Sequence, residues 1–251
     1  MAIGDQSRTR QYSVSRGQIY FKKSGTAYYK QLGNTPELSF NQEIADLSHY
    51  SSRSGTNTRD AYVVLQQDVM SSFVLDEFSP ENLQNFFMST LLSETTQTAA
   101  AKTVQITSAV QGGVYDLGFY NWSSAVVSTT GGSPDWTLNT DYEIDLVGGI
   151  LLITTSSGIS GINIQVTGSV TSTSLSAINA ATANTVKGDF MFIGDPPIGP
   201  RLKITGYCAL KPGGDIPMIS DEWAQMPFEA EFEENTSYTG LIDVVHFGYV
   251  S

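Results

Sequence analysis

The sequence has few of the residues from which an enzyme builds a reactive centre. Cys208 is its single cysteine, so no internal disulfide can form, which suits a reducing cytoplasm; in the apolar stretch LKITGYCAL a buried thiol is expected. The two histidines, His49 and His246, are far apart, and neither has a histidine, cysteine or carboxylate at the spacing of metal ligands. Glycine motifs for phosphate or dinucleotide binding are absent. We therefore expect no enzyme, no metal and no cofactor.

Long hydrophobic runs and basic residues are also scarce. No stretch of about 18 apolar residues occurs, so we expect no membrane span, and the segment MAIGDQSRTRQYSVS has no apolar core of a signal peptide. Lys and Arg number 13 against 25 Asp and Glu, a net charge of −12. This balance argues against simple binding to a phosphate backbone, which requires clustered cations.

The charges are unevenly distributed along the chain. Within residues 1–30 the cations are Arg8, Arg10, Arg16, Lys22, Lys23 and Lys30, against Asp5 alone. After Lys211 there is no Lys or Arg, whereas acidic residues are frequent. Two interpretations of this division stay open. Either the charges simply keep the surface solvated, or they form complementary patches that meet between subunits.

Two strands and a polar loop stand out in the first third of the chain. Apolar residues alternate with polar ones over residues 37–44, the period of a half-buried strand, although Gln42 interrupts the apolar side. Residues 61–75 are rich in the Val, Tyr and Phe that strands favour. Between them the stretch LSHYSSRSGTNTRD, residues 47–60, has few apolar side chains. A loop of that length in a compact domain is usually functional or disordered.

A helix is predicted over residues 80–92. Ser79 is a good N-cap and Pro80 suits the first helical position. One face of this helix is apolar and should pack on a sheet; it is formed by Leu83, Phe86, Phe87, Leu91 and Leu92.

Composition divides the chain into three blocks, 1–98, 99–186 and 187–251. The middle block is rich in Ser, Thr, Gly, Val and Ile and has no basic residue between Lys102 and Lys187. Short runs separated by Gly and Ser turns predict strands there, with a hairpin over residues 141–155. The fold class expected for the whole chain is mainly β, with one helix and an additional β-rich inserted segment.

The order of strand, polar loop, strand and helix over QLGNTPELSFNQEIADLSHYSSRSGTNTRDAYVVLQQDVMSSFVLDEFSPENLQNFFMS, residues 31–89, resembles the core of the major tail tube proteins of long-tailed, siphovirus-type bacteriophages. The resemblance covers residues 17–92 and 187–251 best. It implies a sandwich- or barrel-like tube domain built from residues 1–98 and 187–251, with 99–186 as an insertion or outer-surface subdomain. It also implies hexameric rings stacked head to tail, each subunit contributing strands to an inner β-barrel around a DNA channel.

The resemblance assigns roles to two groups of residues. The loop at 47–60 would stack one ring on the next, and its contact residues would be His49, Tyr50, Arg53 and Arg59. Residues 226–233 alternate strictly, so Glu229, Glu231 and Glu233 share one side of a strand. That side would face the channel, joined by Glu37 and Asp68, where carboxylates repel the DNA backbone; an outer, merely solvated face is the alternative.

The partners implied are other copies of the chain, the tail tip or baseplate, the tail terminator and the tape-measure protein, with double-stranded DNA passing through unbound. The protein would be assembled in the bacterial host cytoplasm and located in the virion tail. A tube protein of a contractile tail or secretion system shares this pattern. A β-rich adhesin or capsid-decoration module would suit the Ser- and Thr-rich middle block, and a hydrolase could be built only from distant carboxylates.

Overall fold

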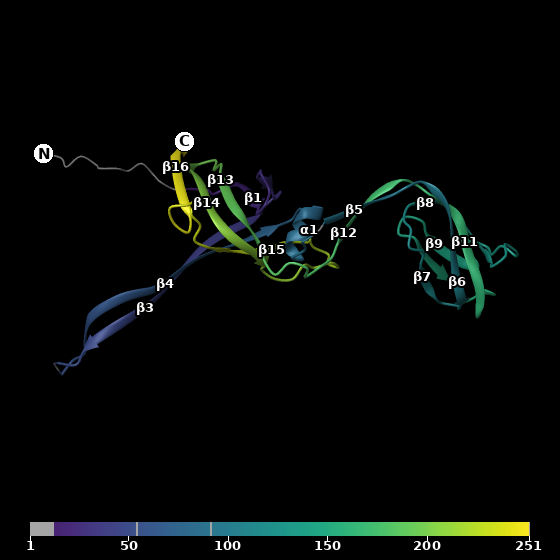
Figure 1. Cartoon of the computed structure of the whole chain (residues 1–251), viewed down its shortest axis with the longest axis horizontal. Coiled ribbons are helices and arrows are strands. Elements are labelled where there is room, and N and C mark those ends of the chain that lie inside the picture. Colours follow the sequence, from purple (N-terminus) through teal and green to yellow (C-terminus); the bar gives the residue numbers. More distant parts are fainter. Residues whose placement is uncertain (1–12, 54, 91, 251) are drawn as a thin grey trace. The chain divides into compact units, whose positions relative to one another are not determined.

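The computed structural model describes residues 13–53, 55–90 and 92–250, and it is mainly β, as the sequence predicts (Figure 1). The chain divides into two units. Unit 1 takes the described residues up to Leu92 and those from Ile178 onward, and unit 2 is Ser93–Ala177. The compositional blocks end instead at residues 98 and 186.

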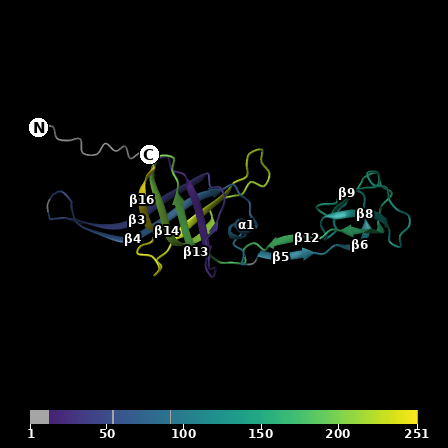
Figure 2. The ribbon, with the colours of Figure 1, turned by 90° about the horizontal axis from the view of Figure 1, so that it is seen from above.

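Unit 1 is one antiparallel sheet with the strand order β2-β1-β13-β14-β15-β4-β3, and β16 also pairs with β14 (Figure 2). β16 and β15 occupy successive stretches of the same β14 edge. The strands are β1 (Gly17–Lys23), β2 (Lys30–Gln31), β3 (Glu37–Ser51), β4 (Thr58–Leu75), β13 (Val186–Gly194), β14 (Gly199–Pro212), β15 (Met226–Phe232) and β16 (Asp243–Val250).

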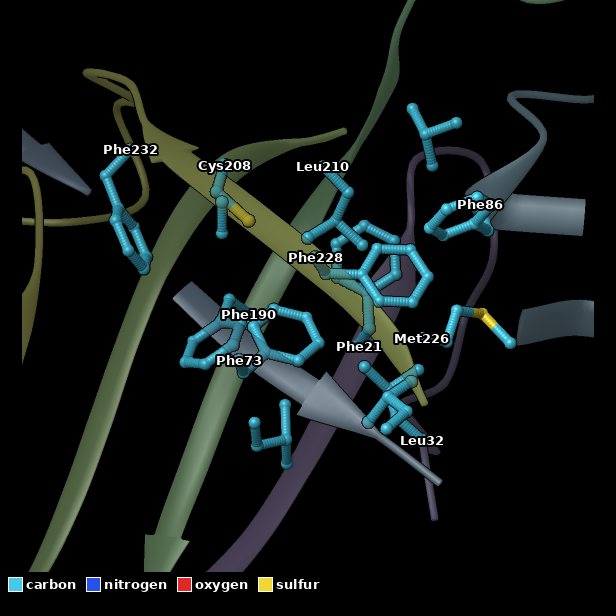
Figure 3. Packing of buried hydrophobic residues seen from close by; sticks show 14 of the residues in the cluster. Phe21, Leu32, Phe73, Phe86, Phe190, Cys208, Leu210, Met226, Phe228 and Phe232 are labelled. Carbon is cyan, nitrogen blue, oxygen red and sulfur yellow. The ribbon is translucent and has the colours of Figure 1, made fainter. Parts of the chain in front are cut away.

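One face of this sheet carries an aromatic core (Figure 3). The alternation predicted for β15 is confirmed, because Met226, Phe228, Ala230 and Phe232 are all buried. Phe40 of β3, at the end of the strand order, lies 6.1 Å from the ring of Phe190 in β13. The sheet therefore curls round its core, bringing an edge strand back towards the middle strands.

The helix of unit 1, α1, is shorter than predicted and spans Pro80–Phe86. Ser79 caps it as expected, its Oγ accepting the N–H of Asn82 at 3.1 Å. The helix ends because Met88 adopts a left-handed φ of 49°, and the N–H of Ser89 turns back to the carbonyl of Gln84 at 2.9 Å, which completes a C-terminal capping motif.

The predicted apolar face of the helix is only partly correct. Phe86 is buried and meets Phe228 of β15 edge to face at 5.6 Å, so the expected packing of the helix on a sheet is confirmed there. Phe87 is 38% exposed and caps the helix end instead. Leu92 begins the next strand, and Leu91 lies outside the described residues.

The long loop expected at 47–60 is wrong in its bounds. β3 continues to Ser51 and β4 begins at Thr58, so only residues 52–57 connect the two strands. The strands are held by backbone pairing from Glu37↔Val74 to Ser51↔Thr58, interrupted by two bulges. Such strands are hard to recognise in the sequence, because a two-stranded ribbon that is solvated on both faces has no need for alternating apolar and polar residues.

Unit 2 contains two three-stranded antiparallel sheets, β6-β11-β8 and β7-β10-β9, whose apolar residues form a core of their own. The predicted hairpin at 141–155 is present as β9 and β10. β5 and β12 pair with each other. The strands are β5 (Leu92–Gln97), β6 (Ala100–Ala109), β7 (Val114–Asp116), β8 (Trp122–Thr129), β9 (Tyr142–Asp145), β10 (Ile150–Ile153), β11 (Ile162–Val170) and β12 (Thr173–Ile178).

Candidate functional site

The far part of the β3–β4 hairpin, residues 44–66, projects from the sheet of unit 1 as an arm (Figure 1). Large apolar side chains on it are between 38% and 66% exposed: Ile44, Leu47, Tyr50, Tyr62, Val63, Val64 and Leu65. A two-stranded hairpin is at best marginally stable alone in water. The arm thus offers apolar surface that its own subunit does not cover.

The structure places three of the four predicted stacking residues within strands of the arm. His49 and Tyr50 are neighbours on β3, so their side chains leave opposite faces. His49 Nδ1 lies 2.5 Å from Asp60 Oδ1, and the guanidinium of Arg59 lies 4.8 Å from the ring centre of Tyr62. Only Arg53 belongs to the connecting segment at the tip.

Four of the predicted channel residues share one face of the unit 1 sheet. Glu229 of β15 pairs with Ser72 of β4, which pairs with Ser39 of β3. Because side chains on every second residue share a face, this register brings Glu37, Asp68, Glu229 and Glu231 to the same side. That side is opposite the aromatic core, which holds Phe228 and Phe73.

Lysines on the neighbouring strands accompany these carboxylates. Lys211 Nζ lies 3.2 Å from a Glu229 oxygen and also contacts Glu231, and Lys187 Nζ lies 2.6 Å from Glu233. Hydrogen bonds to Glu231 and Glu229 raise the pKa of Lys211, and the bond to Glu233 raises the pKa of Lys187. The face is therefore partly neutralised rather than uniformly acidic.

Neither lysine is among the site residues predicted from the sequence. Lys211 stands opposite Glu229 only through the pairing of β14 with β15, and Lys187 reaches Glu233 from β13. A sequence signal exists for the first of these pairs alone. Lys211 and Glu229 lie near the facing ends of two strands that follow each other in the sequence, which makes an antiparallel pairing of these strands a hypothesis that the sequence allows.

Unit 1 also presents unpaired strand edges. Among the described residues β16 pairs with β14 alone, and its Val244, Val245 and Phe247 are about half exposed. β3 is the last strand of the order and pairs with β4 alone. Exposed edges of this kind are templates for pairing with another chain unless something covers them.

The described residues contain no group of three or more His, Cys, Asp or Glu side chains placed to hold a metal ion. Cys208 is fully buried, and burial raises the pKa of its thiol. Within the part of the chain that the structure describes, no helix has the length and apolar character needed to cross a membrane.

A family model with the description "Protein of unknown function UCP028589" matches residues 12–250. Its match spans residues of both units. No curated protein matches the chain.

Proposed function

We propose, for a chain that belongs to the UCP028589 family, that it is a structural protein whose copies assemble into stacked rings, forming the tail tube of a long-tailed bacteriophage. The observation that carries the proposal is the arm at residues 44–66. Its exposed apolar side chains on both faces of a ribbon have no use in an isolated subunit, and burying them against another subunit would stabilise the assembly by about 25 cal/mol per Å².

The unpaired edges support ring formation. An edge of β16 and an edge of β3 lie at different places on the sheet, so joining them between copies is a heterologous contact. Such contacts form a closed ring when a whole number of the rotations that relate neighbouring copies adds up to 360°. Pairing would remove the edges that otherwise expose the chain to aggregation.

The polar face of the sheet supports a channel that DNA traverses without being held. Its carboxylates outnumber the lysines that neutralise them, with Glu37 and Asp68 in no salt bridge among the described residues. A wall of modest negative charge repels phosphates over about 8 Å at physiological salt. In this proposal tail tip, terminator and tape-measure proteins are the other partners.

Electron microscopy of the purified protein over a range of concentrations, with light scattering for mass, tests the proposal. Rings and tubes are the expected result. In an armless variant, Asn-Gly replaces residues 46–65, which closes the hairpin at the directly paired Ala45 and Gln66. We expect this variant to keep its thermal transition and to lose its tubes.

A matched point variant separates arm contacts from general surface polarity. Leu47 and Val63 are paired across the arm, so Leu47→Ser with Val63→Ser removes apolar area from one face. As the control, Val114→Ser with Val147→Ser likewise replaces two exposed apolar side chains by serine, but in unit 2. Tubes lost only in the first variant support the role of the arm; tubes of normal length from the armless variant contradict it.

A decoration module is the second candidate, and the observation that favours it is the separate core of unit 2. Monomers that bind preformed capsids or cells and form no rings at any concentration would support that function instead.

A further inference from the structure

The connection between β14 and β15, residues 213–225, exposes apolar side chains that its own subunit leaves uncovered. Ile219 is 99% exposed and Trp223 is 91% exposed, and Met218 is also mostly exposed. A tryptophan side chain buries a large area when it finds a partner and is enriched at the centres of interfaces. Its almost complete exposure here indicates a contact made with another molecule.

A notch of about 210 Å³ lies beside this connection. Trp223 contributes an indole ring to it, Val74, Pro217 and Pro227 add apolar walls, and Asp215 and Glu222 supply carboxylates. An aromatic face beside carboxylates suits a guanidinium, which stacks on the ring and donates forked hydrogen bonds to the acids. Neither Asp215 nor Glu222 forms a salt bridge within the described residues.

The notch and the arm tip lie at opposite ends of one strand. Met226, directly after the connection, pairs with Leu75 at the end of β4, whereas Thr58 at the start of β4 borders the arm tip. At about 3.3 Å per residue, the 18 residues of β4 separate these ends by on the order of 55 Å. In Figure 2 the arm and the yellow-green connection extend from opposite ends of the sheet.

We propose that the notch receives Arg53 from the arm of a second copy of this chain. This inference rests on the proposed function, because head-to-tail stacking is what brings the arm tip of one copy to the far end of the next. Arg53 is exposed at the tip and forms no salt bridge among the described residues. Arg59, the other arginine of the arm, already stacks on its own Tyr62.

The charge balance favours this occupant. No Lys or Arg follows Lys211 in the sequence, so the notch has no cation from its own connection. The exposed Met218 and Ile219 beside it offer apolar surface to the similarly exposed side chains of the arm. One contact would then combine a cation with two carboxylates and bury the apolar area beside them, so charge complementarity and apolar burial would both favour the complex.

A charge swap between the two sites tests the contact. Arg53→Glu and Glu222→Arg should each abolish tubes or shorten them severely in full-length protein, and the double variant should recover them. Trp223→Ala should also lose tubes, whereas Glu143→Arg, an exposed acid of unit 2, should assemble normally. Recovery in the double variant is the decisive result, because a folding defect in either single variant would not be repaired by the other.

A second readout follows the tryptophan directly. The fluorescence spectrum of Trp223 is obtained by subtracting the spectrum of the Trp223→Phe variant, which contains only Trp122 and Trp136, from that of the wild type. We expect its emission maximum to shift to the blue on assembly of the wild type. In the Arg53→Glu variant it should not shift. Tubes of normal length from both Trp223→Ala and Glu222→Arg would overturn this proposal while the loss of tubes in the armless variant still supports stacking by the arm. Normal tubes without the arm, or no tubes from wild type, would contradict both proposals.

Discussion

Phe73 and Phe228 face each other across the pairing of β4 with β15, with ring centres 5.4 Å apart and planes 13° from parallel. Both are fully buried. Phe86 of α1 meets Phe228 edge to face at 5.6 Å. One ring thus joins the helix to the strand that continues into the arm.

Phe228→Ala should destabilise unit 1 by about 3–5 kcal/mol, because it removes a fully buried ring and leaves a cavity. Urea denaturation followed by circular dichroism measures the loss. Phe247→Ala is the matched control, since that ring is 49% exposed on an edge strand, and its cost should be far smaller. Equal costs for the two variants would contradict the assignment of the core.

Ala181→Gly should stabilise the protein by up to about 1 kcal/mol. Ala181 has a left-handed φ of 57° and an exposed side chain, and that conformation is strained for L residues but not for glycine. Its N–H donates to the carbonyl of Phe87 at 2.8 Å, a bond that the change keeps. Ala183→Gly, at a position of ordinary φ, should instead be neutral or destabilising, and thermal melts of the pair decide the sign.

The stability of unit 1 should fall as pH rises above about 8.5, the ordinary pKa of a thiol. Burial raises the pKa of Cys208 in the folded chain, so the thiol stays protonated while the unfolded chain ionises. Below about pH 8.5 the thiol is protonated in both the folded and the unfolded state, so it contributes no pH dependence. Above about pH 8.5 ionisation of the thiol in the unfolded state lowers the free energy of unfolding by at most about 1.4 kcal/mol per pH unit. Cys208→Ala should flatten this slope between pH 8.5 and 9.5 in urea titrations, whatever its absolute cost.

Glu229→Lys with Glu231→Lys should leave tubes able to assemble and should slow or stall passage of DNA. The change places two new cations beside Lys211, and cations on a channel wall hold phosphates, with an effect that weakens as salt rises. Glu94→Lys with Glu143→Lys, two exposed positions of unit 2, is the control for net charge. Genome delivery at the wild-type rate, with these side chains on the outer wall of a tube map, would contradict the channel assignment.

Local periodicity is enough to predict the strands that have one solvent-exposed face and one buried face. The burial of Met226, Phe228 and Ala230 follows from strict alternation alone. Strand composition predicts residues 61–66 of the arm correctly, whereas residues 45–51 and 58–60 are missed, because both faces of the arm are solvated and no periodic pattern marks these stretches. The predicted helix extends too far because the chain turns at Met88, whose left-handed φ is normally marked in a sequence by glycine.

For the candidate surfaces, the sequence predicts only which residues of one strand share a face, and not which residues of neighbouring strands lie beside them. Glu229 and Glu231 share a face by parity, but their proximity to Lys211 depends on how β14 pairs with β15. The position of Glu37 and Asp68 on the same face depends likewise on the register of β3, β4 and β15. Such registers are set by packing across the sheet, which no short stretch of sequence contains.

The chain leaves unit 1 at Leu92 and returns to it at Ile178, and the strands that carry it out and back, β5 and β12, are hydrogen-bonded to each other. Paired strands run about 4.8 Å apart, so exit and re-entry occur at nearly one point. Replacing Ser93–Ala177 by a short turn, or by another domain whose termini are adjacent, would therefore cost unit 1 little loop-closure entropy. Unit 2 can thus be exchanged for another domain without redesigning the sheet of unit 1.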